Sequence, residues 1–557
     1  MSRELPNDGQ RFDLIVVGAG VNGTGIARDA AMRGLRVLLL DKGDLASGTT
    51  SWSSRLIHGG LRYLEHREFG LVRESLRERE RLLHVAPHLV EPLPLLIPIY
   101  RGDRRGPLLI RVGMVAYDIL SFDKSLPRHR MLSRDAALRR APGLRRDGLR
   151  GAAVYYDAQI AFAERLAVEN ALDARDHGAA IVTYARADRL LTDAGDQTVR
   201  GVAYTDLVNG GTRDALAPVT LNVAGPWVDR LLTDKAGTRS EPMIGGTKGS
   251  HIIVEPFPGA PRDALYVEAE RDGRPYFIIP WNDLYLIGTT DERYHGDLDR
   301  VVATEEEIQY LIDETNRTIP SAGLTRASVC YTYSGVRPLP YQAKGAEGAI
   351  TRRHIVHDHA PELQGLLSIV GGKLTTYRNL AEQAVDAVFK RLGRHAPPSP
   401  TARIPVPGGR LPGDGEVAAR RNIFIAELGR TNVSPRTAER LFHIYGVRAA
   451  AILRLAEREP ALWTPLRVET DAIQAEVVFA VQDELALTLS DILLRRTMIG
   501  LGPDVGVGAD EAVACVAHRF LGWDDNRVRD EIAGYREYIE RFTPRAIPHV
   551  SSERPSL

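Results

Sequence analysis

A glycine-rich turn between two short apolar segments constrains this fold more than any other feature. Residues 12–17 are apolar and rich in β-branched side chains, which predicts a buried parallel strand, and residues 35–40 predict a second. The turn carries three glycines at the spacing G-x-G-x-x-G: Gly18, Gly20 and Gly23. Asp41 follows the second strand, where an acidic group accepts hydrogen bonds from an adenosine ribose. The unit therefore predicts a dinucleotide-binding domain; glycines needed only for packing are the alternative.

Length and composition indicate a multidomain protein of ordinary charge. The 557 residues suffice for two to four structural units. Lys+Arg and Asp+Glu number 72 each, so net charge gives no indication of nucleic-acid binding. The two cysteines, Cys330 and Cys515, form no metal-type spacing, and we expect both to be reduced and buried in a cytoplasmic protein. Residues 1–10 lack the apolar core of a signal peptide, and no apolar run reaches 18 residues.

Two later segments point back to the dinucleotide site. Residues 55–66, RLIHGGLRYLEH, carry Gly59 and Gly60 beside His58, and paired glycines allow a backbone to approach another group closely. Residues 221–229, LNVAGPWVD, repeat the order strand, glycine, helix. The chain is therefore expected to return to the same sheet, which makes the nucleotide-binding domain discontinuous.

The remaining segments predict a substrate domain and a helical C-terminal region. Residues 245–255 and 276–290 read as antiparallel strands, with Asn282 and Asp283 in a hairpin turn. Such a sheet beside a dinucleotide domain commonly forms a substrate pocket. The Pro- and Gly-rich stretch 396–415 reads as a linker. The chain beyond it is mostly helical, and its sequence indicates no chemistry.

Seven segments, taken in order, resemble a known enzyme family. They are GAGVNGTGIARDAAMRGL, SSRLIHGGLRYLE, NVAGPWVD, KGSHIIV, IPWNDLYLIGTTD, TYSGVRPL and GGKLTTYRNLAE. They resemble the FAD-dependent glycerol-3-phosphate dehydrogenases, which are respiratory enzymes of the D-amino-acid-oxidase type, and here the aerobic bacterial type. The resemblance is dense over residues 12–382, and DILLRRT at 491–497 resembles the family's C-terminal signature. One departure is Asp41, where flavoproteins often have glutamate; the shorter side chain offers the same acceptor.

The resemblance implies an α/β fold with three parts: a discontinuous Rossmann-like FAD-binding domain, an antiparallel-sheet substrate cap and a C-terminal helical domain. The expected FAD-binding segments are residues 12–100, 151–235 and 346–392. The expected cap segments are 101–150 and 236–345, followed by a linker at 393–415 and the helical domain at 416–557.

The resemblance also implies an activity. This is the oxidation of sn-glycerol 3-phosphate to dihydroxyacetone phosphate, by hydride transfer from C2 to flavin N5, with electrons passed to a membrane quinone. One alternative is a flavin oxidase on the same substrate, which would reduce oxygen to peroxide. A second alternative is a related flavoenzyme that acts on amino acids or amines. The cluster of basic residues argues against it, because an amine substrate has no phosphate for them to bind. A non-enzymatic flavin-binding regulator is a third, and the retained histidines and cations argue against it.

Site residues follow from the matching motifs. The implied FAD-binding residues are Gly18, Gly20, Gly23, Asp41, Ser54, His58, Gly59, Gly225, Gly372 and Thr375. The implied base is His251, with His58 as the second candidate, because histidine accepts a proton near neutral pH. The implied cations for the substrate phosphate are Arg62, Arg337, Arg352 and Lys373. Arginine suits phosphate because its planar fork binds two oxygens and stays charged. No metal is expected.

Residues 108–120 are mostly apolar and are flanked by arginines and a lysine. A helix of this length is too short to span a bilayer. It reads either as an amphipathic segment lying in a membrane interface or as a buried helix of the cap. The resemblance implies peripheral attachment to the inner face of the cell membrane, which favours the interface; a homodimer is also possible.

Overall fold

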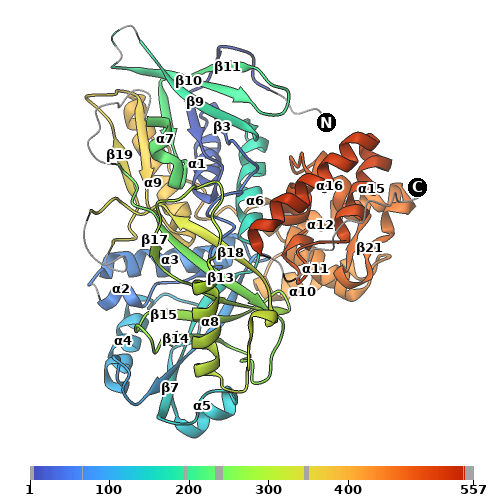
Figure 1. The fold of residues 1–557 in the computed structure, drawn as a ribbon. Helices are drawn as coiled ribbons and strands as arrows, with labels where there is room; N and C mark the ends of the chain where they lie inside the picture. The colour runs from blue at the N-terminus through green and yellow to red at the C-terminus, as the bar shows by residue number, and fades with distance from the viewer. Residues whose placement is uncertain are drawn as a thin grey trace.

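The computed structural model describes residues 5–65, 67–193, 195, 197–232, 242–343, 350–543 and 545, without the side chains of Arg62 and Val468. Figure 1 shows three regions: a nucleotide-binding region at the top, a sheet-based cap at the bottom and a helical C-terminal region at the right.

A six-stranded sheet forms the centre of the upper region. Its order is β19-β20-β12-β2-β3-β8, and all neighbours are parallel except the antiparallel pair β19 and β20. These strands are β2 (Leu14–Val17), β3 (Val37–Leu40), β8 (Ala180–Val182), β12 (Val219–Asn222), β19 (Ile355–Asp358) and β20 (Leu366–Val370). They come from well-separated parts of the chain, so the expected discontinuous Rossmann-like domain is confirmed.

Different elements cover the two faces of this sheet. Successive side chains of a strand point to opposite faces, so alternate residues of β2 belong to two different cores. Leu14 and Val16 face a core shared with α1 (Val21–Met32), α6 (Ala163–Asp176) and α9 (Tyr377–Arg391). Ile15 and Val17 face a second core, shared with a four-stranded sheet of order β1-β11-β10-β9. Those strands are β1 (Gln10–Arg11), β9 (Ala185–Thr192), β10 (Val199–Asp206) and β11 (Thr212–Leu216).

The lower region is a mainly antiparallel sheet of ten strands. Its order is β17-β13-β16-β15-β14-β5-β7-β4, with β18 beside β13 and β6 beside β7. The strands are β4 (Leu56–Ile57), β5 (Val90–Tyr100), β6 (Arg130–Ser133), β7 (Leu149–Ile160), β13 (Thr247–Val254), β14 (Ala264–Glu268), β15 (Pro275–Trp281), β16 (Leu284–Gly288), β17 (Glu292–Arg293) and β18 (Val329–Arg337). The predicted hairpin is present: Asn282 and Asp283, both at positive φ, connect β15 and β16.

Helices cover both faces of the cap sheet. The face that carries Ile252 packs against α5 (Arg134–Arg140) and α8 (Glu305–Thr318). The face that carries Ile253 packs against α3 (Phe69–Val85) and α4 (Pro107–Leu120).

The expected domain boundaries differ from the strand pairing in three places. Strand β4 pairs with β7 in the cap sheet, although residues 56–57 lie inside the expected FAD-binding segment 12–100. Strands β5 and β7 pair with each other along their whole length inside the cap sheet, so residues 90–100 and 151–160 belong to the cap and not to the FAD-binding segments. An apolar run indicates that a strand is buried but does not indicate which sheet it joins, so the sequence assigned these two strands to the wrong domain. The boundaries at 235/236 and 345/346 lie outside the described residues.

The stretch 393–415 is packed against the protein and is not a free linker. The N–H of Val406 donates to the carbonyl of Val85 at 2.9 Å, and that of Gly408 donates to Glu169 Oε2 at 2.6 Å. Arg28 Nη2 also donates to the carbonyl of Ile404 at 2.9 Å. These contacts fix how the C-terminal domain joins the nucleotide-binding region.

The C-terminal domain is mainly helical. Its principal elements are α10 (Val417–Leu428), α11 (Pro435–Tyr445), α12 (Ala449–Arg458), α13 (Gln474–Gln482), α14 (Leu489–Asp491), α15 (Ala509–Leu521) and α16 (Asp525–Ile539). One hydrophobic core runs from this domain into the cap. Cys330 is buried as expected, but Cys515 is exposed on α15, contrary to the expectation. Within the described ranges, no helix is long and apolar enough to cross a membrane.

Candidate functional site

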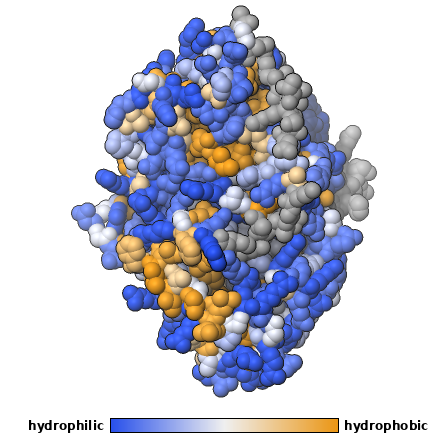
Figure 2. Space-filling model, turned by 90° about the vertical axis from the view of Figure 1, so that its left-hand side faces the viewer, coloured by the Kyte–Doolittle hydropathy of each residue, from blue (hydrophilic) through white to orange (hydrophobic). Residues whose placement is uncertain are grey.

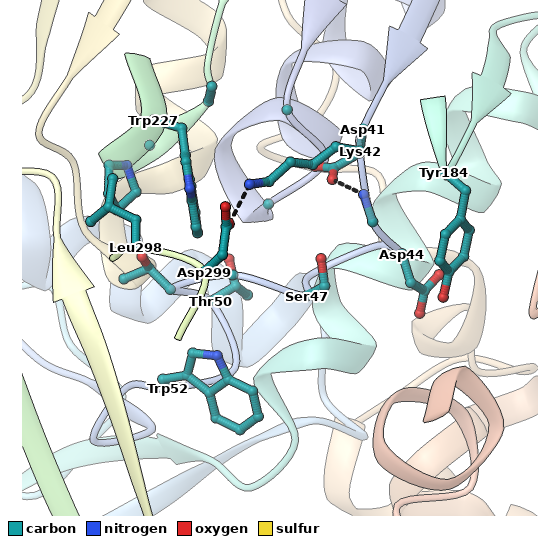
Figure 3. Close-up of a pocket in the computed structure, with 18 of the residues that line it drawn as sticks. Asp41, Lys42, Asp44, Ser47, Thr50, Trp52, Tyr184, Trp227, Leu298 and Asp299 are labelled. Carbon is teal, nitrogen blue, oxygen red and sulfur yellow. Dashed lines mark hydrogen bonds and ion pairs between the residues drawn. The ribbon is translucent and has the colours of Figure 1, made fainter. Parts of the chain in front are cut away.

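A cavity of about 1370 Å³ lies at the carboxyl ends of β2, β3 and β12. The chain leaves β2 toward β3 on one side, whereas β12 pairs with β2 on the other side. Open α/β sheets bind ligands at the carboxyl ends of their strands. Figure 3 shows Asp41, Asp44 and Tyr184 along one wall, Trp227 and Asp299 along the opposite wall, and Trp52 below.

The three glycines of the first turn have three different environments. Gly18 has φ +111°, and a Cβ there would lie 2.6 Å from the carbonyl oxygen of Val223. A Cβ on Gly23 would lie 1.8 Å from the carbonyl oxygen of Gly18, so this glycine lets α1 pack onto β2. Gly20 instead lines the cavity at the start of α1, and its nearest neighbour for a Cβ is Thr50 Oγ1 at 3.2 Å. A helix start with bare backbone is suited to a pyrophosphate.

Asp41 lines the cavity beside this turn. Its Oδ2 accepts from the N–H of Ala19 at 2.5 Å, and its Oδ1 accepts from the N–H of Gly43 at 2.8 Å. Burial raises the pKa of Asp41 to about 6, against the effect of these two donors. Each oxygen keeps a lone pair for a ribose hydroxyl.

The other implied FAD-binding residues divide into two groups. Gly225 and Gly372, both at positive φ, line the cavity. Thr375 and the loop at 58–59 lie beside it, where the N–H of His58 donates to Thr375 Oγ1 at 3.1 Å. Gly59 is a packing glycine, because a Cβ there would lie 2.5 Å from the hydroxyl of Tyr117.

His251 is buried in β13, and its Nε2 lies 2.9 Å from Ser54 Oγ. Its Nδ1 has no hydrogen-bond partner within the described part of the chain. Burial, followed by the charges of Arg337 and Arg55, holds the pKa of His251 well below its usual range. The imidazole is therefore neutral at physiological pH. The second candidate, His58, is also neutral, because burial lowers its pKa to about 4.

Two of the predicted cations meet on one carboxylate that the sequence analysis missed. Asp291 Oδ1 lies 3.0 Å from Arg337 Nη1, and its Oδ2 lies 3.3 Å from Arg352 Nη2. Burial would raise the pKa of Asp291, but Arg337 and Arg352 hold it below the usual value. The only signal was its place at the end of the segment IPWNDLYLIGTTD, which carried the resemblance as a whole.

Lys373 lines the cavity at the turn before α9. Its Nζ lies 3.7 Å from the centroid of the Tyr63 ring and 3.3 Å from Ser75 Oγ. Burial, assisted by the charge of Arg352 and opposed by the charge of Glu74, lowers the pKa of Lys373 to about 7. The backbone of Arg62 begins α2 (Arg62–Glu65), but its side chain lies outside the described residues. No group of three metal-ligating side chains occurs in the described parts of the chain.

Comparison with known proteins agrees with this geometry. The family described as FAD-dependent oxidoreductase matches residues 13–378, and the C-terminal domain of alpha-glycerophosphate oxidase matches residues 399–528. The chain is 48% identical over 541 residues to a glycerol-3-phosphate dehydrogenase of Synechocystis, covering 95% of this chain and 96% of the relative. This chain belongs to the FAD-dependent glycerol-3-phosphate dehydrogenase family. A Mycobacterium leprae relative of the same name is 37% identical over 538 residues, covering 95% of this chain and 88% of the relative.

A solved structure shares both the fold and the cofactor type of this family. The glycerol-3-phosphate dehydrogenase of Bacillus halodurans complexed with FAD aligns with a TM-score of 0.76 at 27% identity, covering 98% of this chain and 97% of that one. The cofactor is FAD, and the residues present fit it: Gly20 leaves space at the helix start, and Asp41 faces the cavity. These residues would hold the pyrophosphate and the adenosine ribose.

Proposed function

We propose that this enzyme oxidises sn-glycerol 3-phosphate to dihydroxyacetone phosphate and passes the electrons to a membrane quinone. The observation that carries the proposal is a cluster of positive charges: Arg337 and Arg352 share Asp291, and Lys373, on which the charge of Arg352 acts, lines the cavity beside Gly372. The names of the relatives support the same substrate. Bound FAD supplies the acceptor for the hydride that leaves C2 of the substrate.

In this proposal the two arginines bind the phosphate. Asp291 holds both guanidinium groups on one carboxylate, which prevents their mutual repulsion from driving them apart. A phosphate presents paired oxygens that accept from a guanidinium fork as a carboxylate does, so it would bind to the two arginines beside Asp291. Lys373 would add a third positive charge while it is protonated.

His251 would accept the proton from the substrate hydroxyl. A neutral imidazole can accept a proton, and Nδ1 has no partner within the described residues. The Ser54 hydroxyl, next to Nε2, fixes the ring orientation. A dianionic phosphate nearby would raise the proton affinity of this ring, which strengthens it as a base when substrate is bound.

The quinone would be reached from a membrane surface formed by α4. The inner side chains of this helix, among them Ile110 and Tyr117, are buried against the cap. Its outer face exposes five large apolar side chains: Leu108, Leu109, Val112, Val115 and Ile119. Phe122, two residues beyond the end of the helix, is exposed as well. Figure 2 shows this face as the large orange patch in the lower half of the molecule. An apolar helix face with basic neighbours is typical of a segment that lies in a bilayer interface.

The proposal is tested by anaerobic mixing of the holoenzyme with sn-glycerol 3-phosphate. We expect rapid bleaching of the flavin absorbance and rapid reoxidation by a soluble quinone analogue. Glycerol serves as the control substrate, because it lacks the phosphate. Failure of glycerol 3-phosphate to bleach the flavin would contradict the proposed substrate.

A second candidate is an oxidase on the same substrate, and the match of residues 399–528 to the alpha-glycerophosphate oxidase C-terminal domain favours considering it. The two differ in how the reduced flavin is reoxidised. Peroxide formed at the rate of substrate turnover in air would support the oxidase and contradict quinone as the acceptor.

A further inference from the structure

The loop that follows Asp41 is tied to the C-terminal domain by a buried cluster of charges. Asp44 and Arg496 are 1% and 0% exposed. Arg496 donates to Asp44 twice, from Nη2 to Oδ1 at 2.8 Å and from Nη1 to Oδ2 at 2.9 Å. Arg495 Nε donates to the same Oδ2 at 2.6 Å. The sequence signature DILLRRT thus binds a loop of the nucleotide-binding region.

An unusual helical turn presents both arginines to one carboxylate. Residues Ile492–Arg496 form a π-helical turn, in which the N–H of Thr497 donates to the carbonyl of Ile492 at 2.9 Å. Consecutive side chains of a regular α-helix do not face the same neighbour. Single π turns inside helices occur frequently at functional sites. The wider turn accounts for the convergence of Arg495 and Arg496 on Asp44.

A chain of hydrogen bonds continues from this cluster to the carboxylate that faces the cavity. Asp491 accepts from Arg495 Nη2 at 2.7 Å and from the hydroxyl of Tyr184 at 2.6 Å. The N–H of Tyr184 donates to the carbonyl of Gly43 at 3.0 Å, and the N–H of Gly43 donates to Asp41 at 2.8 Å. Asp41, Asp44, Tyr184 and Arg495 all line the cavity, and Figure 3 shows the first three on one wall.

Holding the two domains together does not require this cluster. Buried ion pairs contribute little net stability, because removing the charges from water costs about as much as their attraction returns. An extensive apolar core already joins the C-terminal domain to the rest of the protein. The four charges of Asp44, Asp491, Arg495 and Arg496 balance, and their geometry fixes the position of the loop that carries Asp41 and Asp44.

We propose that Arg495 and Arg496, acting through Asp44, are positioning residues that hold this loop in the conformation that binds the adenosine end of FAD. The C-terminal domain is thereby a cofactor-retention element, whichever substrate or electron acceptor the enzyme uses.

The test measures FAD affinity and not turnover. Asp44→Asn keeps the shape of the side chain but removes its charge. Losing a hydrogen bond between charged groups should weaken FAD binding to the apoprotein by roughly tenfold to 100-fold, measured by the quenching of flavin fluorescence on binding. The rate of FAD release from the holoprotein should rise in parallel.

A matched control separates positioning from general stability. Glu169 is also a fully buried carboxylate at the contact with the C-terminal domain, where it lies 3.4 Å from Arg448. Its contacts are with Gly408, Arg165 and Arg448 and not with the loop at 41–44. Glu169→Gln should lower the unfolding temperature of the apoprotein and leave FAD affinity unchanged.

Two results would overturn the proposal: unchanged FAD affinity in Asp44→Asn, or equal weakening in Asp44→Asn and Glu169→Gln. If Asp44→Asn does not fold, Arg496→Lys replaces it, because lysine keeps the charge but loses the two-pronged contact. That variant should release FAD faster and exchange the amide hydrogens of residues 42–51 faster. If Arg496→Lys releases FAD and exchanges these amide hydrogens at the wild-type rates, the proposal is also contradicted.

Discussion

Nε2 of His251 lies 2.9 Å from Oγ of Ser54, inside a buried site that keeps the imidazole neutral. The proposed base is therefore oriented by a hydroxyl group, while its other nitrogen is buried and has no hydrogen-bond partner among the described residues. His251→Asn removes the proton acceptor at similar size. We expect the anaerobic rate of flavin reduction to fall about 100- to 10,000-fold, the range for loss of a general base.

The FAD content of His251→Asn should equal that of the wild type, because the variant leaves Gly20 and Asp41, the residues that would hold FAD, unchanged. Ser54→Ala keeps the imidazole but frees its orientation, so its loss of rate should be smaller. A near-normal rate in His251→Asn would transfer the role of base to His58 or to a water molecule.

The pairing of Arg337 with Asp291 predicts a selective loss. If Arg337 binds the substrate phosphate as proposed, Arg337→Ala removes a hydrogen bond worth roughly 1.5–3 kcal/mol. The value of kcat/KM for glycerol 3-phosphate should fall roughly tenfold to 150-fold, and the slow turnover of glycerol should scarcely change. Steady-state assays on both substrates decide the matter. Equal losses on the two substrates would show that Arg337 supports the fold or the flavin and does not read the phosphate.

The lowered pKa of Lys373, about 7, predicts a pH dependence. This amine is protonated below that pH and neutral above it. If Lys373 helps bind the phosphate, kcat/KM for glycerol 3-phosphate should fall as pH rises through 7, because kcat/KM reports the protonation state of the free enzyme. At pH 8 about one molecule in ten would carry the charge.

Lys373→Arg supplies the control for this profile, because arginine stays charged throughout the range. Its kcat/KM should be independent of pH between 7 and 9 if Lys373 is the titrating group. The same alkaline fall in both proteins would assign the titration to another residue.

The features that the sequence predicted correctly are those that depend on the conformation of a few neighbouring residues. The turn from Gly18 to Gly23 is fixed by backbone sterics, and the hairpin at Asn282 and Asp283 is fixed by the positive φ that both residues adopt. These features need few distant contacts. The start of α11 is likewise determined locally: Ser434 caps the helix by accepting from the N–H of Thr437 at 3.0 Å.

The missed features depend on contacts between distant parts of the chain. Asp44 and Arg496 are separated by 452 positions, and neither carries a local pattern that indicates the other. Asp291 likewise becomes part of the site only when β13 and β18 bring Arg337 beside it. The strands β5 and β7 were assigned to the wrong sheet because their apolar runs specify burial and not a pairing partner.

The exposed face of α4 gives the last prediction. Leu109 and Val112 are 56% and 58% exposed, so aspartates there should leave the fold intact. Charges placed in an apolar interface cost free energy of transfer from water, so Leu109→Asp with Val112→Asp should prevent flotation with anionic liposomes. Activity with a soluble dye acceptor should remain.

Ile423→Asp is the matched control, because Ile423 is 60% exposed but lies on α10 of the C-terminal domain. That variant should float with liposomes as the wild type does. If the wild type itself stays in the soluble fraction, or if Ile423→Asp releases the protein as effectively, α4 is not the membrane-binding surface.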